Sequence, residues 1–432
     1  MNVSALLCSA ATLASALVCG AAHAQSVGAR LGLEQSLEAA RRNVEVRWQE
    51  QARSAAQADV LVADRAPFPV LTGKLSQMDL QHRLGSGPLW KKPFDRSIGV
   101  DWTYERGNKR ELRTEAARRA VAAAEADVST LVLQQQVATS AAFYDLLAAQ
   151  ERVLGVRELS EQADHLARTS RRRLQAGDVS DQDNRRVEVE SERARADVLS
   201  AELDRRRASV GLAQLTGLSP RPEDAEFWSA EASWPAAAPA SAVPPGAAAD
   251  WIERYPSVEA ARARLAAAES LLDGAQALRK VDPVVGASLD RLPGTSNALL
   301  ELRVSIPLQT GRGYDGEVAR AGALLEQARL ALDRERIAAR SDLQLRENEL
   351  AAATARWRTY DQDILPRARK VAEQAEFAYA KGALPLVDLL DARRTLRAAL
   401  LEALAARADD AKARGAWRLM TQTLAKAAGT PP

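Results

Sequence analysis

The chain has 432 residues, and its 59 basic and 57 acidic side chains leave a formal net charge of only +2. This balance excludes the strongly basic surface that nucleic-acid binding requires, so no nucleic acid is expected as a partner. The two cysteines, Cys8 and Cys19, lie close to the N-terminus. The rest of the chain therefore has no thiolate for a disulfide, a metal site or nucleophilic catalysis.

The N-terminal segment has the pattern of an export signal. Residues 5–22 are mostly apolar, and Ala22-His23-Ala24 gives the small-x-small ending that signal peptidase accepts. The pattern predicts a signal peptide over 1–24, with an uncleaved membrane anchor as the alternative. Beyond Ala24 no run of about 18 apolar residues follows.

Long helices are predicted for most of the remaining chain. Proline is absent between Pro93 and Pro220 and again between Pro307 and Pro366, and Ala, Leu, Arg and Glu dominate these stretches. A helix of about 65 residues would be close to 100 Å long, far longer than a compact domain needs. Apolar residues at seven-residue spacing add a coiled-coil signal; they are Val187, Ala194, Ala201, Ala208 and Leu215. The helices are expected over 111–176, 181–216, 315–380 and 386–424.

Four short segments have the residue pattern of β-strands instead. Ile98, Val100, Trp102 and Tyr104 alternate with polar or small residues, and residues 300–308 alternate in the same way. Such alternation places one face of a strand in lipid or in a core and the other in water. We predict strands near 70–80, 97–105, 283–290 and 299–308.

The two halves of the chain repeat this order of elements. Gly107 and Glu111 recur as Gly313 and Glu317, and the pair Gly177 and Asp183 recurs, at almost the same offset, as Gly382 and Asp388. We expect a first repeat over 25–217, a Pro/Ala-rich linker over 218–255, a second repeat over 256–426 and a C-terminal tail over 427–432. The predicted fold class is mainly α with a small β part, built from two helix–hairpin–helix repeats.

Four strands are too few to close a barrel in a membrane. Open strand edges in lipid leave backbone groups unpaired, at a cost of several kcal/mol each, and a barrel needs about eight strands or more. The chain must therefore oligomerise if these strands lie in a bilayer, and a trimer would supply twelve.

The order and spacing of several motifs resemble the TolC-like outer-membrane efflux factor family, over nearly the whole chain after residue 24. The motifs are Leu33–Asn43, Leu212–Gly217, Tyr255–Val258, Ile364–Pro366, Tyr379–Gly382 and Val387–Asp391. Within the family, residues 105–110 and 142–147 are similar to the branch that serves cobalt–zinc–cadmium resistance pumps.

This resemblance implies a homotrimer in the bacterial outer membrane that extends into the periplasm. Each chain would form one third of a 12-stranded β-barrel continuous with a long periplasmic α-helical barrel. A periplasmic adaptor, an inner-membrane pump of the resistance–nodulation–division (RND) type and outer-membrane lipid would be its partners. The implied function is a passive exit duct of a tripartite efflux pump, for metal cations or small toxic compounds. A duct for type I protein secretion and a non-pore periplasmic coiled-coil or adaptor protein are the alternatives.

The resemblance also assigns roles at the periplasmic tip. Asp388 and Asp391 are three residues apart and share a helix face; the family match makes them the channel aperture, and an ordinary solvated face is the alternative. Asp183 and Tyr379 correspond to a gate latch, although Leu384 stands where the family has a second, basic partner.

Two glycines that recur in both halves have a predicted structural role. Gly177 and Gly382 are expected to form the helix-tip turns, because glycine accepts a positive φ without strain.

No catalytic chemistry is predicted. His82 and His165 have no further metal-binding residues near them, and the sequence shows neither a phosphate-binding glycine loop nor a recognisable acid–base pair. We expect no enzyme activity, no metal site and no cofactor.

Overall fold

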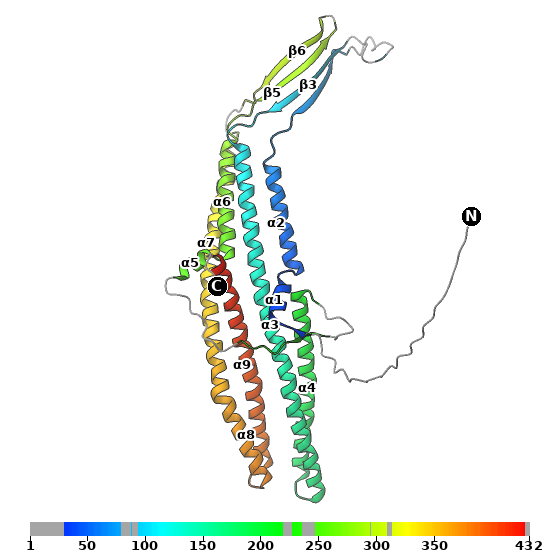
Figure 1. The fold of residues 1–432 in the computed structure, drawn as a ribbon, viewed down its shortest axis with the longest axis vertical. Helices are drawn as coiled ribbons and strands as arrows, with labels where there is room; N and C mark the ends of the chain where they lie inside the picture. The colour runs from blue at the N-terminus through cyan, green and yellow to red at the C-terminus, as the bar shows by residue number, and fades with distance from the viewer. Residues whose placement is uncertain are drawn as a thin grey trace, which may run out of the picture.

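The computed structural model describes residues 30–78, 88, 94–218, 227–235, 247–293, 295–308 and 313–427. The predicted signal peptide over 1–24, parts of the linker and all but the first residue of the C-terminal tail lie outside these ranges. The described chain is an elongated rod with a small β-sheet at one end and long helices along the rest (Figure 1).

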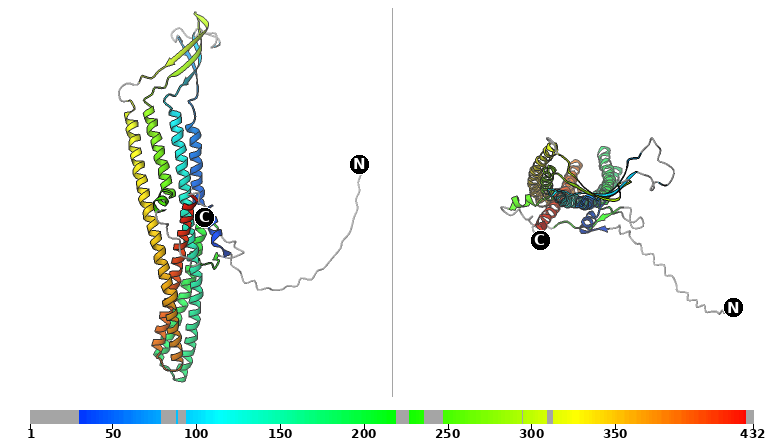
Figure 2. Two further views of the ribbon diagram at one scale, coloured as in Figure 1. Left: turned by 60° about the vertical axis from the view of Figure 1, so that its left-hand side comes forward. Right: turned by 90° about the horizontal axis from the view of Figure 1, so that it is seen from above.

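Four helices lie side by side in the half of the rod next to the sheet. Contacts between successive helices give the order α2-α3-α6-α7. Seen from above, the chain follows an open, shallow arc rather than a closed ring (Figure 2). The helices are α2 (Val44–Ala63), α3 (Lys109–Ala176), α6 (Pro256–Ala277) and α7 (Asp315–Thr359).

In the half of the rod away from the sheet, two antiparallel helix pairs replace this layer. α3 packs against α4 (Asp181–Thr216), and α8 (Leu365–Ala380) packs against α9 (Leu386–Ala427). α3 also contacts α9, so the order across this half is α4-α3-α9-α8. The α3–α4 and α8–α9 pairs end together at the tip of the rod.

The strands form one antiparallel sheet in the order β2-β3-β5-β6. Pairing of β3 with β5 joins the hairpin of the first repeat to that of the second, as the partners Ile98 and Leu289 illustrate. The strands are β2 (Val70–Ser76), β3 (Asp95–Thr103), β5 (Val284–Leu292) and β6 (Ser296–Ser305).

A small group of short elements surrounds the middle of the rod. The two-residue strand β1 (Arg30–Leu31) pairs in parallel with β4 (Ser229–Ala230), and α1 (Leu33–Ala40) packs on α3. α5 (Ala247–Glu253) contacts α6 and α7. The segment expected to be a linker over 218–255 therefore contains regular structure where it is described.

Small apolar residues allow the helices to approach closely. Val187 and Ala201, two members of the predicted seven-residue pattern, are fully buried between α4 and its neighbours. α3 is continuous through Gly155, where an added Cβ would meet no other heavy atom within 4 Å.

The helix expected over 315–380 is interrupted by a π-helical turn at Tyr360–Ile364, between α7 and α8. The N–H of Leu365 donates to the carbonyl of Tyr360 instead of that of Asp361. Pro366 explains the change, because it has no N–H and its ring would clash with the carbonyl four residues earlier in a regular α-helix.

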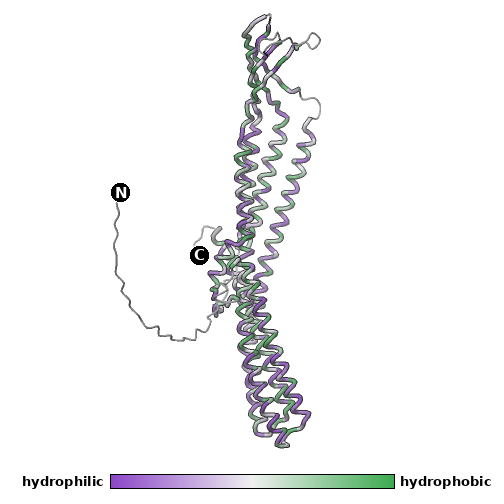
Figure 3. The backbone as a smooth tube through the Cα atoms, turned by 90° about the vertical axis from the view of Figure 1, so that its right-hand side faces the viewer, coloured by the Kyte–Doolittle hydropathy of each residue, from purple (hydrophilic) through white to green (hydrophobic). Residues whose placement is uncertain are grey.

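No described helix is both long enough and apolar enough to cross a membrane. Hydrophilic and hydrophobic residues are intermixed along the whole rod (Figure 3).

Candidate functional site

The sheet has one apolar face, and in the single chain this face is exposed. Ile98 and Val100 of β3 lie beside Leu289 and Ala287 of β5, and these lie beside Leu300 and Leu302 of β6. The exposed fractions of Ile98, Leu300 and Leu302 are 58%, 73% and 77%. A row of large apolar side chains this exposed requires an apolar surrounding.

The opposite face of the sheet is polar. The Arg303 guanidinium of β6 reaches across β5 to the Asp101 carboxylate of β3, with an N–O distance of 2.7 Å. The two side chains pass over Gly286, which is the partner of both residues in the register. A Cβ on Gly286 would lie 2.0 Å from Asp101 Oδ1, so glycine is required for this ion pair.

Charged groups join the sheet to the helices. Lys109, at the start of α3, contacts the Asp282 carboxylate at 2.6 Å and is mostly buried. Arg113 binds Glu105 through two hydrogen bonds and also donates to the carbonyls of Ala63 and Arg65. These contacts fix the direction in which the strands leave the helical layer.

At the tip, the two predicted turn glycines lie at the ends of α3 and α8. Gly177 has φ +80° and Gly382 has φ +74°. In each turn the residue after the glycine donates its N–H five residues back, from Asp178 to Arg173 and from Ala383 to Ala378. This is the hydrogen-bond pattern of a Schellman motif, which ends a helix sharply.

The two latch candidates lie at the same end of the rod, on different helix pairs. Ser180 and Asp183 exchange hydrogen bonds at the start of α4, with Oγ–Oδ2 and N–Oγ distances of 2.9 and 3.1 Å. Tyr379 of α8 is half-buried, and the Arg173 guanidinium lies 5.6 Å from its ring centroid. Within the described chain Asp183 and Tyr379 do not bond to each other, so the latch stays a prediction.

Asp388 and Asp391 lie in the first two turns of α9, and both are exposed. They face away from Leu389 and Leu390, which are buried in the cluster that packs the tip. In the part of the chain that the structure describes, neither carboxylate has an ion-pair partner within 4.0 Å. The aperture role of this exposed acidic face is untested.

Two contacts between the helix pairs near the tip were not foreseen from the sequence. Arg394 of α9 binds Glu190 of α4 at 2.8 Å, and Arg397 of α9 binds Asp197 of α4 at 2.6 Å. The hydrogen bond that Arg394 donates to the Glu190 carboxylate raises the pKa of Arg394 above its ordinary value. Charged residues at these positions are visible in the sequence, but their partners depend on how the two helix pairs meet.

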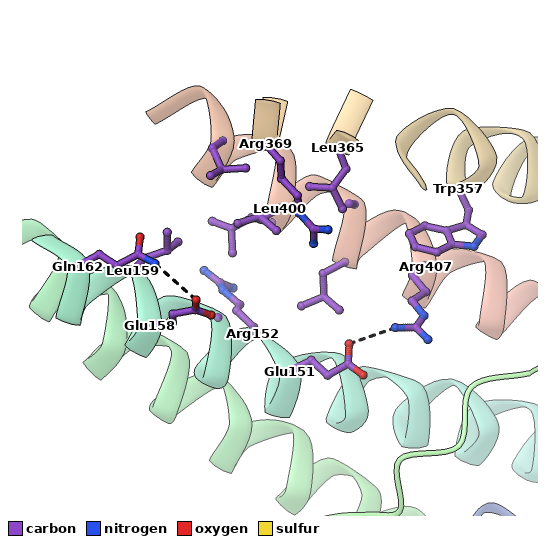
Figure 4. A pocket seen from close by; sticks show the side chains of 15 residues that line it. Glu151, Arg152, Glu158, Leu159, Gln162, Trp357, Leu365, Arg369, Leu400 and Arg407 are labelled. Atoms are coloured by element: carbon purple, nitrogen blue, oxygen red, sulfur yellow. Dashed lines mark hydrogen bonds and ion pairs between the residues drawn. The ribbon is translucent and has the colours of Figure 1, made fainter. Parts of the chain in front are cut away.

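A groove lies between α3, α8 and α9 beside the π-helical turn, with a volume of about 460 Å³. Figure 4 shows Leu365 and Leu400 at its wall, with the side chains of Arg152 and Arg369 reaching toward it from α3 and α8. Arg407 lies at one end, where its guanidinium is 4.5 Å from the Trp234 ring and 5.7 Å from the Trp357 ring. The π-turn thus lies beside a groove between the two helix pairs.

No group of three or more potential metal ligands occurs among the described residues. His165 lies on α3, and His82 lies outside the described ranges.

An outward apolar sheet continuous with a rod of paired helices defines a class of outer-membrane channel proteins. The family model described as outer membrane efflux protein matches residues 36–218. The cobalt-zinc-cadmium resistance protein CzcC of Cupriavidus metallidurans is 27% identical over 295 residues, which are 68% of each chain.

Two solved structures share the fold. The chain aligns with CusC at a TM-score of 0.70 and 16% identity, over 92% of each chain. With the open state of the Neisseria gonorrhoeae MtrE outer membrane channel the TM-score is 0.67 at 18% identity, over 90% of this chain and 88% of the other. These likenesses confirm the predicted fold class.

The match of residues 36–218 to the outer membrane efflux protein family agrees with the resemblance that the sequence motifs predicted. The chain is an efflux channel of the bacterial outer membrane that extends into the periplasm, and members of this family are channels rather than enzymes.

Proposed function

We propose that three copies of this chain form the exit duct of a tripartite efflux pump that exports metal cations. A periplasmic adaptor and an inner-membrane RND pump would complete the conduit and supply the energy. The duct itself is passive.

The observation that carries this proposal is the sheet with two open edges and one exposed apolar face. Among the described strands, β2 and β6 each have a single neighbour. Unpaired edges cost several kcal/mol per backbone group in lipid, so β6 of one copy must pair with β2 of the next. Three sheets of four strands then close a 12-stranded barrel with its apolar face toward lipid and its polar face toward the lumen.

The helical layer supports the same closure. In the half next to the sheet, the outermost helices α2 and α7 have exposed large apolar residues, among them Trp48 at 67% and Leu330 at 69%. In the tip half the outermost helices are α4 and α8, with Leu199 at 69% and Phe377 at 67% exposure. Apolar residues at both ends of an arc provide matching surfaces for neighbouring copies.

A cationic cargo is supported by the acidic face at the start of α9. In a trimer Asp388 and Asp391 would contribute six carboxylates around the axis at the tip. A ring of like charges in a narrow passage attracts cations and repels anions. The similarity to a cobalt-zinc-cadmium resistance protein favours divalent metal ions.

The gate in this proposal is the contact between the α3–α4 and α8–α9 pairs. The predicted latch between Asp183 and Tyr379 and the two ion pairs made by Arg394 and Arg397 would hold the pairs together at the tip. Exposed ion pairs are each worth about 1 kcal/mol or less, so a docked partner can break them.

The experiment is membrane fractionation followed by planar-bilayer recording of the purified protein. We expect a heat-modifiable trimer in the outer membrane with cation-selective conductance. Asp388→Ala with Asp391→Ala should lower the cation selectivity and the block by multivalent cations. Asp361→Ala with Asp363→Ala, an exposed pair on the π-turn, is the matched control.

Two outcomes would count against the proposal. A soluble periplasmic monomer would remove the duct, and unchanged selectivity in the Asp388/Asp391 variant would remove the aperture assignment while leaving the duct in place.

A further inference from the structure

Arg407 of α9 connects three helices and the inter-repeat linker beside the π-helical turn. Its guanidinium lies between two indole rings, 4.5 Å from that of Trp234 in the linker and 5.7 Å from that of Trp357 in the last turn of α7. It also contacts the Glu151 carboxylate of α3 at 3.4 Å, which is the dashed line to Arg407 in Figure 4. The three residues Trp234, Arg407 and Trp357 are called the Arg407 stack below.

The linker is itself attached to α3 at this height. Trp234 stacks on Tyr144, with ring centroids 6.0 Å apart and an interplanar angle of 14°, and its indole N–H donates to Glu151. The side chain of Gln150 exchanges two hydrogen bonds with the backbone of Ala230 in β4. The linker therefore crosses α3 at a defined place and presents the Trp234 ring to α9.

Packing between α3 and the second helix pair differs on the two sides of the Arg407 stack. On the sheet side α3 and α9 are in close contact, because a Cβ added to Gly415 would collide with the buried Ser140 hydroxyl. On the tip side the groove of about 460 Å³ lies between α3, α8 and α9. The groove leaves space for α8 and α9 to move relative to α3, whereas the close contact at Gly415 does not.

Polar contacts also join α7 to α9 on the sheet side of the stack. Arg414 and Thr354 bind the Asp410 carboxylate at 2.7 and 2.6 Å, and the Arg414 and Asp410 side chains are only 10% and 8% exposed. A groove of about 510 Å³ lies beside them, and two residues that line it, Arg356 of α7 and Asp409 of α9, are paired at 3.1 Å. Breaking a buried ion pair costs more than breaking an exposed one, so these contacts resist separation of α7 and α9.

We propose that the Arg407 stack is the pivot of the gate. When the contact between the helix pairs opens at the tip, α8 and the tip half of α9 tilt about the stack, and the helices on its sheet side keep their positions. The inference rests on the gate in the proposed function. The π-turn directly after α7 supplies the flexible point, because a widened turn is a common place for a helix to bend.

The test measures the distance between two spin labels in one chain of the full-length protein by double electron–electron resonance. Labelled chains are diluted with unlabelled ones, so that only distances within a chain are recorded. His165→Cys with Gln374→Cys reports the tip side, and Leu154→Cys with Ala405→Cys reports the height of the stack; all four positions are exposed. Gln374 is 14 residues beyond Tyr360 (374 minus 360), or about 21 Å, so a tilt of about 10° would move it by about 4 Å.

Arg394→Glu, which opposes Glu190, is the opening variant. It should shift the tip-side distance by about 4 Å and leave the stack-height distance unchanged. Adding Arg407→Ala should lengthen and broaden the stack-height distance, because no cation then holds α9 between the two indole rings. Arg407→Lys keeps a cation beside the rings and should return the stack-height distance toward that of Arg394→Glu alone.

Arg152→Ala is the matched control. Arg152 lines the same groove and pairs with Asp204 at 3.2 Å, but both residues belong to the α3–α4 pair. Combined with Arg394→Glu, it should leave the stack-height distance unchanged.

Three results would overturn the inference: equal shifts at the two label pairs in Arg394→Glu, an unchanged stack-height distance after Arg407→Ala, or unchanged distances in every variant. Trimer formation and cation-selective conductance test the proposed function separately. A cation-selective trimer in which both distances shift alike removes only the pivot.

Discussion

At the scale of single residues, Gly286 allows an ion pair to connect the two repeats across the polar face of the sheet. It is the middle of a row that crosses three strands, with Asp101 on one side and Arg303 on the other. These two residues are 202 positions apart in the sequence, and their side chains meet only because Gly286 has none.

We predict that Gly286→Ala displaces the Asp101 carboxylate and weakens the assembled protein. The added Cβ would come within 2.0 Å of Asp101 Oδ1, so the contact with Arg303 must lengthen or break. Losing a charge-assisted hydrogen bond costs roughly 1.5–3 kcal/mol. The temperature at which the oligomer dissociates on a detergent gel should fall by several degrees.

Gly73→Ala provides the matched control, because no heavy atom lies within 4 Å of its Cβ position on β2. Equal dissociation temperatures for the two variants would show that the Asp101–Arg303 pair contributes nothing measurable to assembly.

Alternation along each strand could be read from the sequence, whereas this ion pair could not. Leu300, Leu302 and Val304 identify one face of β6 by their spacing alone. The contact between Asp101 and Arg303 also requires that β3 pairs with β5, and no local pattern gives the pairing of strands from different repeats.

At the scale of elements, the contacts between the α3–α4 and α8–α9 pairs determine whether the proposed gate at the tip is open or closed. Within the α3–α4 pair, Asp164 accepts hydrogen bonds from Ser191 and Arg195 at 2.5 and 3.1 Å. The hydrogen bond from Ser191, with help from Arg195, lowers the pKa of the Asp164 carboxyl. The two helix pairs are joined near the tip by a buried apolar cluster, to which Val187 of α4 and Leu389 of α9 belong, and by ion pairs at its edge such as that of Arg394 with Glu190.

We predict that Arg394→Glu loosens the tip, because it places a carboxylate against Glu190. Loss of an exposed ion pair and the new repulsion should increase the open fraction of the channel roughly threefold. The measurement is conductance in planar bilayers, with entry of a large antibiotic into cells as a second readout.

Combining Arg394→Glu with Glu190→Arg restores opposite charges and should return the conductance toward that of the unmodified protein. Arg185→Glu breaks a pair with Asp181 inside one helix, at the same end of the rod, and serves as the control. A charge-swapped protein that stays as open as the single variant would exclude this contact from the gate.

The sequence predicts the helices well where proline and glycine mark their ends. Gly177 and Gly217 follow the last residues of α3 and α4, and both have positive φ. The π-turn at Tyr360–Ile364 was missed, because Pro366 signals a disturbance without specifying whether the helix ends, kinks or widens. The short strand β4 was missed because two residues give no periodicity.

At the scale of the whole molecule, the chain is an open arc, and the helices at both of its ends have exposed large apolar residues. Trp48 of α2 lies 15 residues from the sheet-side end of its helix (63 minus 48), and Leu330 of α7 lies 15 residues from its own sheet-side end (330 minus 315). At about 1.5 Å per residue, both lie about 22 Å below the sheet-side ends of their helices. Closure of three arcs into a ring would bring them to the same height on adjacent copies.

The last prediction therefore concerns cross-linking between copies. Cys8 and Cys19 are the only cysteines in the chain, and both lie within the predicted signal peptide, so cysteines introduced elsewhere would form the only thiol pairs. Trp48→Cys with Leu330→Cys should give covalent dimers and trimers on a non-reducing gel after mild oxidation in membranes. Trp48→Cys with Leu345→Cys places the second thiol about 22 Å farther along α7 and should leave the protein monomeric on the same gel. A disulfide forms only when the two Cα atoms lie within about 7 Å. Cross-linked dimers and trimers from the Trp48/Leu330 pair alone would therefore show that α2 of one copy lies beside α7 of the next, and at which height. Equal cross-linking from both pairs, or none from either, would contradict closure through α2 and α7.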